Sequence, residues 1–362
     1  MANYQSNYRY GESRQKSPRS RKIIFSILLF LIAVSVIVGI LIYNSLRNPN
    51  VWLNNQESVS IYIPTGASFD NVKSILYGTG VIINRKSFEW VAGRKDYPEL
   101  IKPGHYVIKD GMSNEELLNL LRSGNQTPVK VIFNNITNKE KLSQKIGMQL
   151  ETDSLDLITL LNDSVYLSKY GHTDQTLMSL FIPNTYEFYW NTTAEQFVER
   201  MQQEYDKFWT KERLALADSL GLTPLEVISL ASIVEKETAQ NSEKPSIAGV
   251  YINRLNRNWL LQADPTLIFA MDDWGIKRVL NVHKNIDSPY NTYKHGGIPP
   301  GPICSPSISS IDAVLNYEEH DYMFFCAKDD LSGFHAFART SAQHSSNARK
   351  YQRALDNLKI MK

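Results

Sequence analysis

The stretch LASIVEKET at residues 230–238 joins an apolar run to two closely spaced acids, and we take it as the centre of the fold. A helix-start signature precedes it, in which Thr223 caps, Pro224 occupies the first helical position and Glu226 reaches back to the cap amide. The apolar positions then recur at helical spacing, which predicts an amphipathic helix with one buried face. These positions are Val227, Leu230, Ala231, Val234 and Thr238.

The two acids of this helix are candidates for chemistry. Glu235 and Glu237 are two residues apart, so they lie on opposite flanks of the apolar stripe. Partial burial at either flank would disfavour the charged form and raise the pKa, as a general acid at neutral pH requires. The spacing does not choose between them, and an ordinary amphipathic helix with solvated glutamates is the competing interpretation.

Length and composition narrow the class of protein. The 362 residues allow two or three domains with at least one sizeable core. Because 39 basic side chains nearly balance 37 acidic ones, the composition does not indicate a nucleic-acid partner. The two cysteines, Cys304 and Cys326, form no CxxC motif, and we predict no structural zinc site. A disulfide between them cannot be deduced from sequence, and two buried thiols are the simpler interpretation.

The front of the chain indicates a membrane anchor. Residues 23–43 form an uncharged apolar run long enough to cross a bilayer as a helix. The run ends in YNSLR without a small-residue cleavage site, so we predict a retained anchor and not a signal peptide. The preceding basic residues place residues 1–22 in the cytoplasm and everything after Asn44 outside the cytoplasmic membrane. They are Arg9, Arg14, Lys16, Arg19, Arg21 and Lys22.

Three strand–turn–helix units follow a polar tether at residues 44–57. Each begins with alternating apolar residues and continues through a capping signal into a helix. The first two lie near residues 59–76 and 106–121, and the third begins at 129 and has its capping signal at 137–140. The third belongs to a connecting unit at about 127–165. None carries a cluster of titratable residues, so we interpret them as binding or spacer modules.

The segment after the glutamate helix predicts further parts of a reaction domain. Residues 245–256 have helical periodicity, and Asp264 with Pro265 makes an N-cap and first-turn pair, which favours a structural role for Asp264. The Gly- and Pro-rich residues 296–302 are typical of a rigid substrate-lining loop. A hairpin is predicted within 322–338. A last helix is expected to bury Ala348, Tyr351, Leu355 and Leu358.

Six motifs follow one another along the second half of the chain: ASIVEKET (231–238), INRL (252–255), LQADPT (261–266), YNTY (290–293), GIPPGPI (297–303) and HAFARTSAQH (335–344). Together and in this order, they make the chain similar to the YceG-like (MltG) family of endolytic murein transglycosylases. One departure is Asn184, where the family usually has an aspartate. The resemblance implies an α+β fold with one transmembrane helix at 23–43, a small LysM-like module at 58–126 and a mixed α+β catalytic domain at 127–362.

The resemblance also implies an activity. A lytic transglycosylase, a carbon–oxygen lyase, cleaves the MurNAc-β-1,4-GlcNAc bond of peptidoglycan without water and leaves 1,6-anhydroMurNAc ends, which would terminate strand elongation. The catalytic acid of the family matches Glu237. No cofactor and no metal are implied, and the partners would be glycan strands, the membrane and, by resemblance alone, peptidoglycan synthases. Candidates for substrate contact or for orienting the acid are Glu235, Gln262, Asp264, Tyr290, Asn291, His335 and Thr340.

Alternatives remain open at this point. For each candidate contact residue, a loop-stabilising role is an equal interpretation. A hydrolytic muramidase would need a second carboxylate at ~5–9 Å from the first. The sequence offers no clear partner, because Glu235 points away on the same helix and Asp264 has a capping role. A non-catalytic, membrane-anchored wall-binding scaffold is the alternative from another class.

Overall fold

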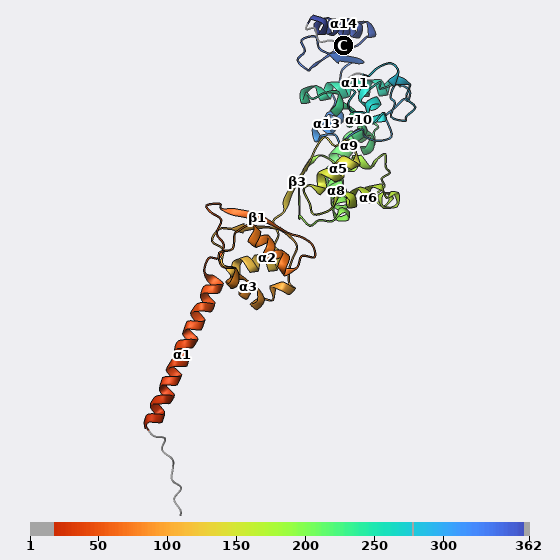
Figure 1. The fold of residues 1–362 in the computed structure, drawn as a ribbon. Coiled ribbons are helices and arrows are strands. Elements are labelled where there is room, and N and C mark those ends of the chain that lie inside the picture. The colour runs from red at the N-terminus through yellow and green to blue at the C-terminus, as the bar shows by residue number, and fades with distance from the viewer. Residues whose placement is uncertain (1–17, 277–278, 358–362) are drawn as a thin grey trace, which may run out of the picture. The chain divides into compact units, whose positions relative to one another are not determined.

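The computed structural model describes residues 18–276 and 279–357. In these ranges the chain is a mixed α+β protein with three two-stranded antiparallel sheets set among helices (Figure 1). The predicted α+β class is therefore confirmed. The chain divides into two compact units, Met1–Thr127 and Pro128–Lys362, and each is described below by itself.

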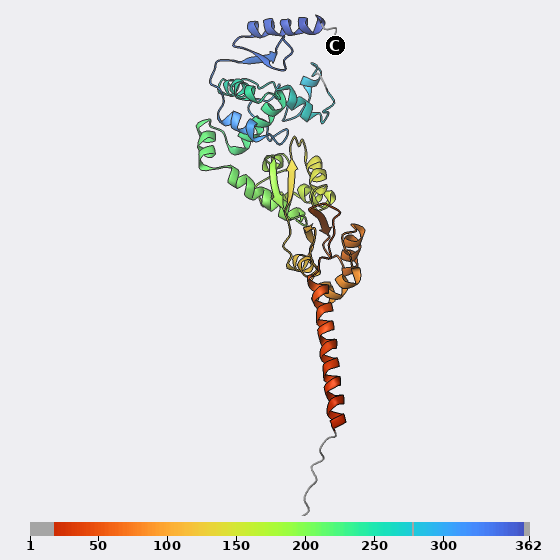
Figure 2. The same ribbon diagram turned by 90° about the vertical axis from the view of Figure 1, so that its left-hand side faces the viewer.

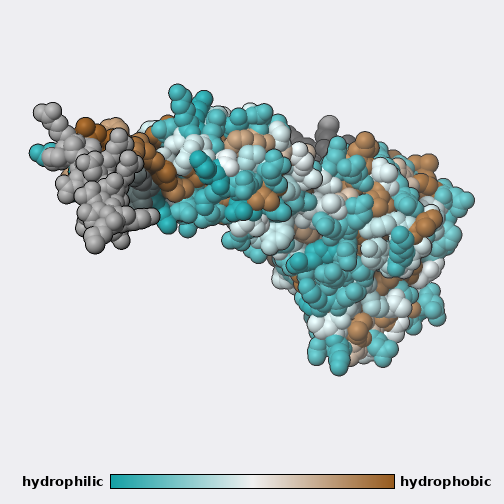
Figure 3. All heavy atoms as spheres, turned by 90° about the horizontal axis from the view of Figure 1, so that it is seen from below, coloured by the Kyte–Doolittle hydropathy of each residue, from teal (hydrophilic) through white to brown (hydrophobic). Residues whose placement is uncertain are grey.

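The first described element is the long helix α1 (Pro18–Arg47). Its part Arg21–Arg47 is long and apolar enough to cross a membrane, and this supports the predicted single N-terminal anchor. Figure 2 shows α1 as one continuous helix, and hydrophobic residues line its visible part in the space-filling view of Figure 3. The predicted basic residues Arg9, Arg14 and Lys16 lie outside the described residues.

The rest of the first unit is a two-stranded antiparallel sheet covered by helices. Strand β1 pairs with β2 in antiparallel register, with Ile61 opposite Tyr106. The predicted capping box at Ser113 is present, and Ser68, predicted only as a cap, forms a capping box as well. The LysM-like assignment of this unit stays a prediction. The elements are β1 (Ser58–Ile63), α2 (Phe69–Gly78), α3 (Arg85–Arg94), η1 (Tyr97–Glu99), β2 (Gly104–Lys109) and α4 (Asn114–Ser123).

The segment predicted as a polar tether is instead part of this unit. Helix α1 continues to Arg47, and the side chains of Val51 and Leu53 are only 2% and 6% exposed. Asn50 donates to Asn114 Oδ1 at 2.7 Å and is itself buried. The polar composition misled the prediction because the Asn50 amide is hydrogen-bonded inside the protein, and Val51 and Leu53 join the core beside it.

The second unit begins with a sheet and a helical layer around one core. Strand β3 pairs with β4, so that Val131 lies opposite Tyr186 and both side chains are buried. Asn184 is the first residue of β4 and is exposed. The elements are β3 (Val129–Phe133), α5 (Lys139–Gly147), α6 (Ser154–Asn162), α7 (Ser164–Ser168), η2 (Leu177–Leu180), β4 (Asn184–Phe188) and α8 (Ala194–Phe208).

Helix α10 (Pro224–Glu237) occupies the centre of the next core and begins with the predicted capping box at Thr223. Every residue from Val227 to Val234 is buried, so the prediction of one buried face was wrong. Ser229 and Ser232 interrupt the apolar run, but Ser232 Oγ donates to the Ser229 carbonyl at 2.6 Å and is satisfied inside the core. Helix α10 contacts α9 (Lys211–Ser219), α11 (Lys244–Asn256), α12 (Asp264–Ala270) and α13 (Ile308–Leu315). This part of the chain also contains η3 (Asn241–Glu243) and η4 (His283–Asn285).

The chain ends in the predicted hairpin and helix. Strands β5 (Phe324–Ala327) and β6 (His335–Ala338) pair in antiparallel register, and α14 (Ser341–Asn357) packs on them. The prediction that the last helix buries its apolar residues was wrong. Ala348, Tyr351 and Leu355 are half-buried, because α14 covers only a two-stranded sheet, and Leu358 lies outside the described residues.

Candidate active site

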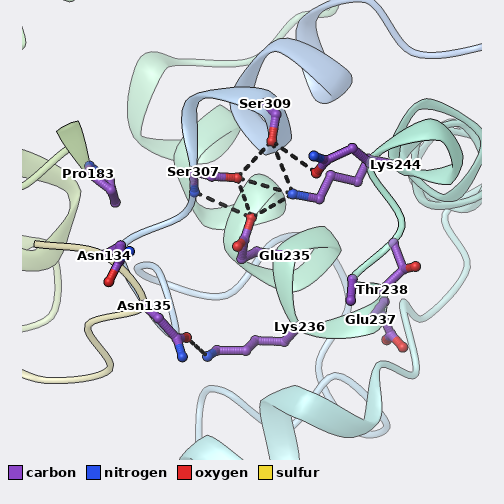
Figure 4. A pocket seen from close by; sticks show the side chains of 12 residues that line it. Asn134, Asn135, Pro183, Glu235, Lys236, Glu237, Thr238, Lys244, Ser307 and Ser309 are labelled. Atoms are coloured by element: carbon purple, nitrogen blue, oxygen red, sulfur yellow. Dashed lines mark hydrogen bonds and ion pairs between the residues drawn. The ribbon is translucent and has the colours of Figure 1, made fainter.

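Glu237 is the last residue of α10 and lines two cavities of about 750 and 710 Å³. Side chains of Glu235, Lys244 and Ser307 line the first cavity. Tyr251 and Asp264 are among the residues that line the second. Figure 4 shows the first cavity, with the carboxyl groups of Glu235 and Glu237 pointing in different directions. Glu237 is therefore the acid that both cavities can reach.

The surroundings of Glu237 favour its protonated form. Its side chain is half-buried, and burial raises its pKa to about 7, with the negative charge of Asp264 acting in the same direction. The hydrogen bond from Tyr251 and the positive charge of Arg254 oppose this rise. The C-terminal end of a helix also disfavours an anion. The result is a carboxyl group that titrates near neutral pH.

Glu235 is in the opposite electrostatic situation. Its Oε2 accepts hydrogen bonds from Ser307 Oγ and Ser310 Oγ, at 2.5 Å each, and from Lys244 Nζ at 3.0 Å. Burial alone would raise its pKa, but these hydrogen bonds and the Lys244 charge outweigh burial and lower the pKa. The geometry thus distinguishes two acids that the sequence spacing could not. Glu235 is ionised at neutral pH and holds the segment around Ser307 through its hydrogen bonds.

Asp264 does not cap a helix, and that prediction was wrong. Ala263 holds the N-cap position of α12, and Asp264 is its first helical residue. The Asp264 carboxylate instead accepts a hydrogen bond from Tyr293 Oη at 2.5 Å and lines the second cavity with Glu237. A second carboxylate is therefore available near Glu237, contrary to the prediction from sequence. Asp264 is held by Tyr293, from a distant part of the chain, and not by the N-terminus of α12.

Two further predicted residues also line the second cavity. Gln262 has a positive φ of 51°, and its N–H donates to the Thr292 carbonyl at 3.0 Å. His335 is held by the buried Glu243, whose carboxylate accepts the His335 N–H at 2.7 Å and lies 3.0 Å from Nδ1. The structure thus brings Gln262, Asp264 and His335 together with Glu237.

Three predicted contact residues do not reach either cavity. The Tyr290 ring is buried against Phe269, with 4.6 Å between the ring centroids. The buried Asn291 amide donates to the carbonyls of Lys284 and Ile286 and so holds its own loop. Thr340 is exposed and accepts the Gln343 N–H at the start of α14. For these three, the loop- or helix-stabilising alternative fits the structure.

Several residues of the second cavity were missing from the predicted site, among them Tyr251, Arg254 and Tyr293. Tyr251 directly precedes INRL, Arg254 lies within it, and Tyr293 closes YNTY. Arg254 is buried and donates to the carbonyls of Met323 and Leu261, so it joins β5 to the segment before α12. Their positions in or next to these motifs were the available signal, but spacing along the chain could not show that the three residues meet in space.

Residues 18–276 and 279–357 contain no group of three or more side chains arranged to hold a metal ion. Both cysteines are free thiols: Cys304 is buried, and Cys326 is half-buried in the wall of the second cavity. Burial raises the pKa of Cys304 to about 12, so this thiol is not a nucleophile at neutral pH.

Comparisons with known proteins cover most of the chain. Residues 61–350 match the model of the YceG-like family. A protein named endolytic murein transglycosylase from Streptococcus pneumoniae serotype 2 (strain D39) is 29% identical, over 82% of this chain and 59% of its own length. One of the same name from Bacillus subtilis (strain 168) is 28% identical, over 87% of this chain and 91% of its own.

The alignment therefore spans about three-fifths of the pneumococcal relative and nearly all of the Bacillus one. A crystal structure of a yceG-like protein from Listeria monocytogenes has a similar fold. It superimposes with a TM-score of 0.55 and 25% identity, over 80% of this chain and 98% of that one.

Proposed function

The chain belongs to the YceG-like family, and from that premise we propose that it is a membrane-anchored endolytic lytic transglycosylase of peptidoglycan. The observation that carries the proposal is Glu237 itself. It is the acid implied by the resemblance, it lines both cavities, and its pKa is raised to about 7. At neutral pH such a group is divided between the acid and base forms, and the proposed reaction needs both in turn.

In the proposed reaction, protonated Glu237 donates its proton to the glycosidic oxygen between MurNAc and GlcNAc. The bond from this oxygen to the muramyl C1 breaks, and positive charge develops on the ring. The Glu237 carboxylate then removes the proton of the muramyl 6-hydroxyl, and that oxygen bonds to C1 to close the 1,6-anhydro ring. Glu237 gives up one proton and takes up another, so it ends the cycle protonated, and no water is consumed.

Neighbouring side chains have supporting roles in this proposal. Tyr251 stabilises the carboxylate between the two steps through its hydrogen bond. The Asp264 carboxylate raises the pKa of Glu237 before the first step and would favour positive charge on the sugar during it. Gln262 and His335 are placed to contact N-acetyl groups in the second cavity. Arg254 and Glu243 act indirectly. Arg254 fixes the segments at Met323 and Leu261, and Glu243 fixes His335.

A hydrolytic muramidase is the second candidate, and one observation favours it. Asp264 lines the same cavity as Glu237, so a second carboxylate is available there. The printed name of the relatives, endolytic murein transglycosylase, favours the lytic reaction. The scaffold alternative assigns no role to an acid with a raised pKa that lines two cavities, so the environment of Glu237 favours an enzyme.

The cellular setting completes the proposal. The N-terminus would lie in the cytoplasm and both units outside, in the cytoplasmic membrane of a bacterium, where nascent glycan strands are made. The first unit would bind glycan without chemistry, as a LysM-like module, and peptidoglycan synthases would be partners. These points rest on the apolar α1, on the basic residues before it and on the family resemblance.

The test is mass spectrometry of purified sacculi digested by the full-length protein in detergent, beside its Glu237→Gln variant. We expect 1,6-anhydro-ended fragments from the wild type. For the variant we expect a rate lower by about two to four orders of magnitude, since glutamine cannot transfer the proton. Fragments with reducing ends would identify a muramidase. Bound but uncleaved strands would identify a scaffold.

A further inference from the structure

The first turn of α3 lies beside the last turn of α1 (Figure 1). Asn114 Nδ2 connects the two, because it donates to the Ser45 carbonyl at 2.9 Å and to Ser87 Oγ at 3.1 Å. Arg47, at the end of α1, pairs with Glu115 at 3.0 Å, and Leu46 packs against the core of the first unit. The end of the membrane helix is thus fixed to the unit that follows it.

These contacts set the depth of α3 relative to the bilayer that α1 crosses. Tyr43 is the last residue of the apolar run. With a rise of about 1.5 Å per residue, Ser45 lies about 3 Å and Arg47 about 6 Å beyond it along the helix axis. The polar headgroup layer is roughly 5–8 Å thick on each side of the hydrocarbon core. The first turn of α3 therefore lies at headgroup depth.

The side of α3 that Asn114 links to α1 has the composition of a membrane interface. Ser87, Trp90 and Arg94 recur at i, i+3 and i+7, so they share the face on which Ser87 accepts the Asn114 amide that also binds Ser45 of α1. The Trp90 residue is 40% exposed, with the Arg94 guanidinium 5.5 Å from its ring centroid. Ile83, just before the α3 cap, is 62% exposed, and Lys86 is exposed as well.

The acidic residue of α3 is on the other flank of the helix. Glu89 accepts a hydrogen bond from Tyr77 Oη at 2.8 Å, and Arg85 lies 4.4 Å from the centroid of the same ring. The flank beside α1 is therefore aromatic, aliphatic and basic. Tryptophan is enriched where a membrane meets water, and Lys and Arg side chains near an anionic leaflet are attracted to it.

We propose that this face of α3, defined by Ile83, Lys86, Trp90 and Arg94, lies in the headgroup layer of the bilayer that α1 spans, with anionic phospholipid as its preferred contact. The first unit is then seated on the membrane surface and not suspended above it on a tether. The inference depends on α1 as a membrane helix and is independent of the cleavage reaction.

The test uses the full-length protein in nanodiscs of phosphatidylcholine and phosphatidylglycerol, with and without bromine on the upper part of the acyl chains. Bromine quenches tryptophan emission at close range. We expect brominated lipid to lower the emission of the wild type, and Trp90→Phe to remove a large part of that loss. Trp259→Phe also removes one exposed tryptophan, from the second unit, and controls for the general fall in emission. Equal quenching of the wild type and Trp90→Phe would overturn the proposal.

A second variant tests the role of charge. Lys86→Glu combined with Arg94→Glu should reduce the quenching of Trp90 in discs that contain phosphatidylglycerol, and change it much less in discs of phosphatidylcholine alone. Added salt should weaken the wild-type signal in the same lipid-dependent way. If the charge reversal leaves the quenching unchanged in both lipids, the preference for anionic headgroups is wrong.

Discussion

The phenol oxygen of Tyr251 lies 2.5 Å from Oε1 of Glu237 and donates a hydrogen bond to it. The acid ends α10 and the phenol comes from the middle of α11, two helices that pack against each other in the same core. Burial and the neighbouring Glu237 carboxylate raise the pKa of Tyr251 well above its ordinary value, so the phenol remains a donor throughout the physiological range. The helix packing therefore fixes the partner of the proposed acid.

Tyr251→Phe should raise the pKa of Glu237, because it removes a hydrogen bond that favours the carboxylate. A hydrogen bond to a charged group is worth about 1.5–3 kcal/mol, so we expect a rise of roughly one unit or more. The alkaline limb of the pH profile of kcat/KM for anhydro-fragment release should move up accordingly. Tyr293→Phe, which removes a similar bond from Asp264, is the matched control. A downward shift in Tyr251→Phe would contradict the assignment of Glu237.

The same group should make stability depend on pH. The folded pKa of Glu237 is about 7 and the ordinary value is 4.5. Between these values the folded state holds a proton that the unfolded state has released, so the wild type loses stability as pH rises through this window. Glu237→Gln lacks this loss. Its free energy of unfolding should exceed that of the wild type increasingly with pH, by at most about 3 kcal/mol. If the difference in free energy of unfolding between the wild type and Glu237→Gln is the same at all pH values, the pKa of Glu237 is not raised in the folded state.

Glu235→Gln should affect stability more than chemistry. Lys244 is only 4% exposed, and Glu235 is its charged partner. The variant leaves the buried Lys244 ammonium with neutral hydrogen-bond partners and no counter-charge. We expect a loss of about 1–3 kcal/mol in the free energy of unfolding, because glutamine still accepts some of the hydrogen bonds.

Activity per folded molecule of Glu235→Gln should exceed that of Glu237→Gln by a wide margin. Lys244→Met in the Glu235→Gln background, which removes the buried charge as well, should recover part of the lost stability. An inactive but fully folded Glu235→Gln protein beside an active Glu237→Gln protein would reverse the proposed roles of the two acids.

Local chemistry made much of the fold predictable from sequence. The caps at Ser68, Ser113 and Thr223 depend on residues three apart. All three form, and Ser68, predicted as a simple cap, also makes a capping box. The hairpin of β5 and β6 and the α1 helix also follow from short-range patterns. In each case the interacting residues are neighbours in sequence or belong to one continuous apolar run.

The site itself depends on contacts that the sequence does not show. Glu235 and Glu237 are equivalent by helical spacing, and distant residues distinguish them: Ser307 and Ser310 bind one, and Tyr251 the other. Asp264 has good capping chemistry, yet it binds Tyr293, 29 residues further on. Local sequence rules predict which structural role suits a residue at a given position. Tertiary packing then decides which partner that residue binds.

The anchor has a direct test of orientation. A reporter fused after Asn44 follows the apolar run, and the basic residues before that run should keep the N-terminus in the cytoplasm. Alkaline phosphatase at this position should therefore be active and β-galactosidase inactive, since the former requires export. The opposite pair of activities would place both units in the cytoplasm, away from the proposed substrate.

Removal of the first unit should weaken substrate binding and spare the reaction. Both cavities at Glu237 are lined only by residues of the second unit, and each hydrophobic core lies within one unit. A chain that begins at Pro128 should therefore fold, as measured by circular dichroism and a cooperative thermal transition. It should release anhydro fragments with an increased KM and a kcat close to that of the full chain, because the lost contacts would bind ground state and transition state alike. The Glu237→Gln form of the shortened chain provides the background rate. If the shortened chain folds but has no activity above that background, then the glycan groove needs residues of both units, and the reaction cannot be assigned to the second unit alone.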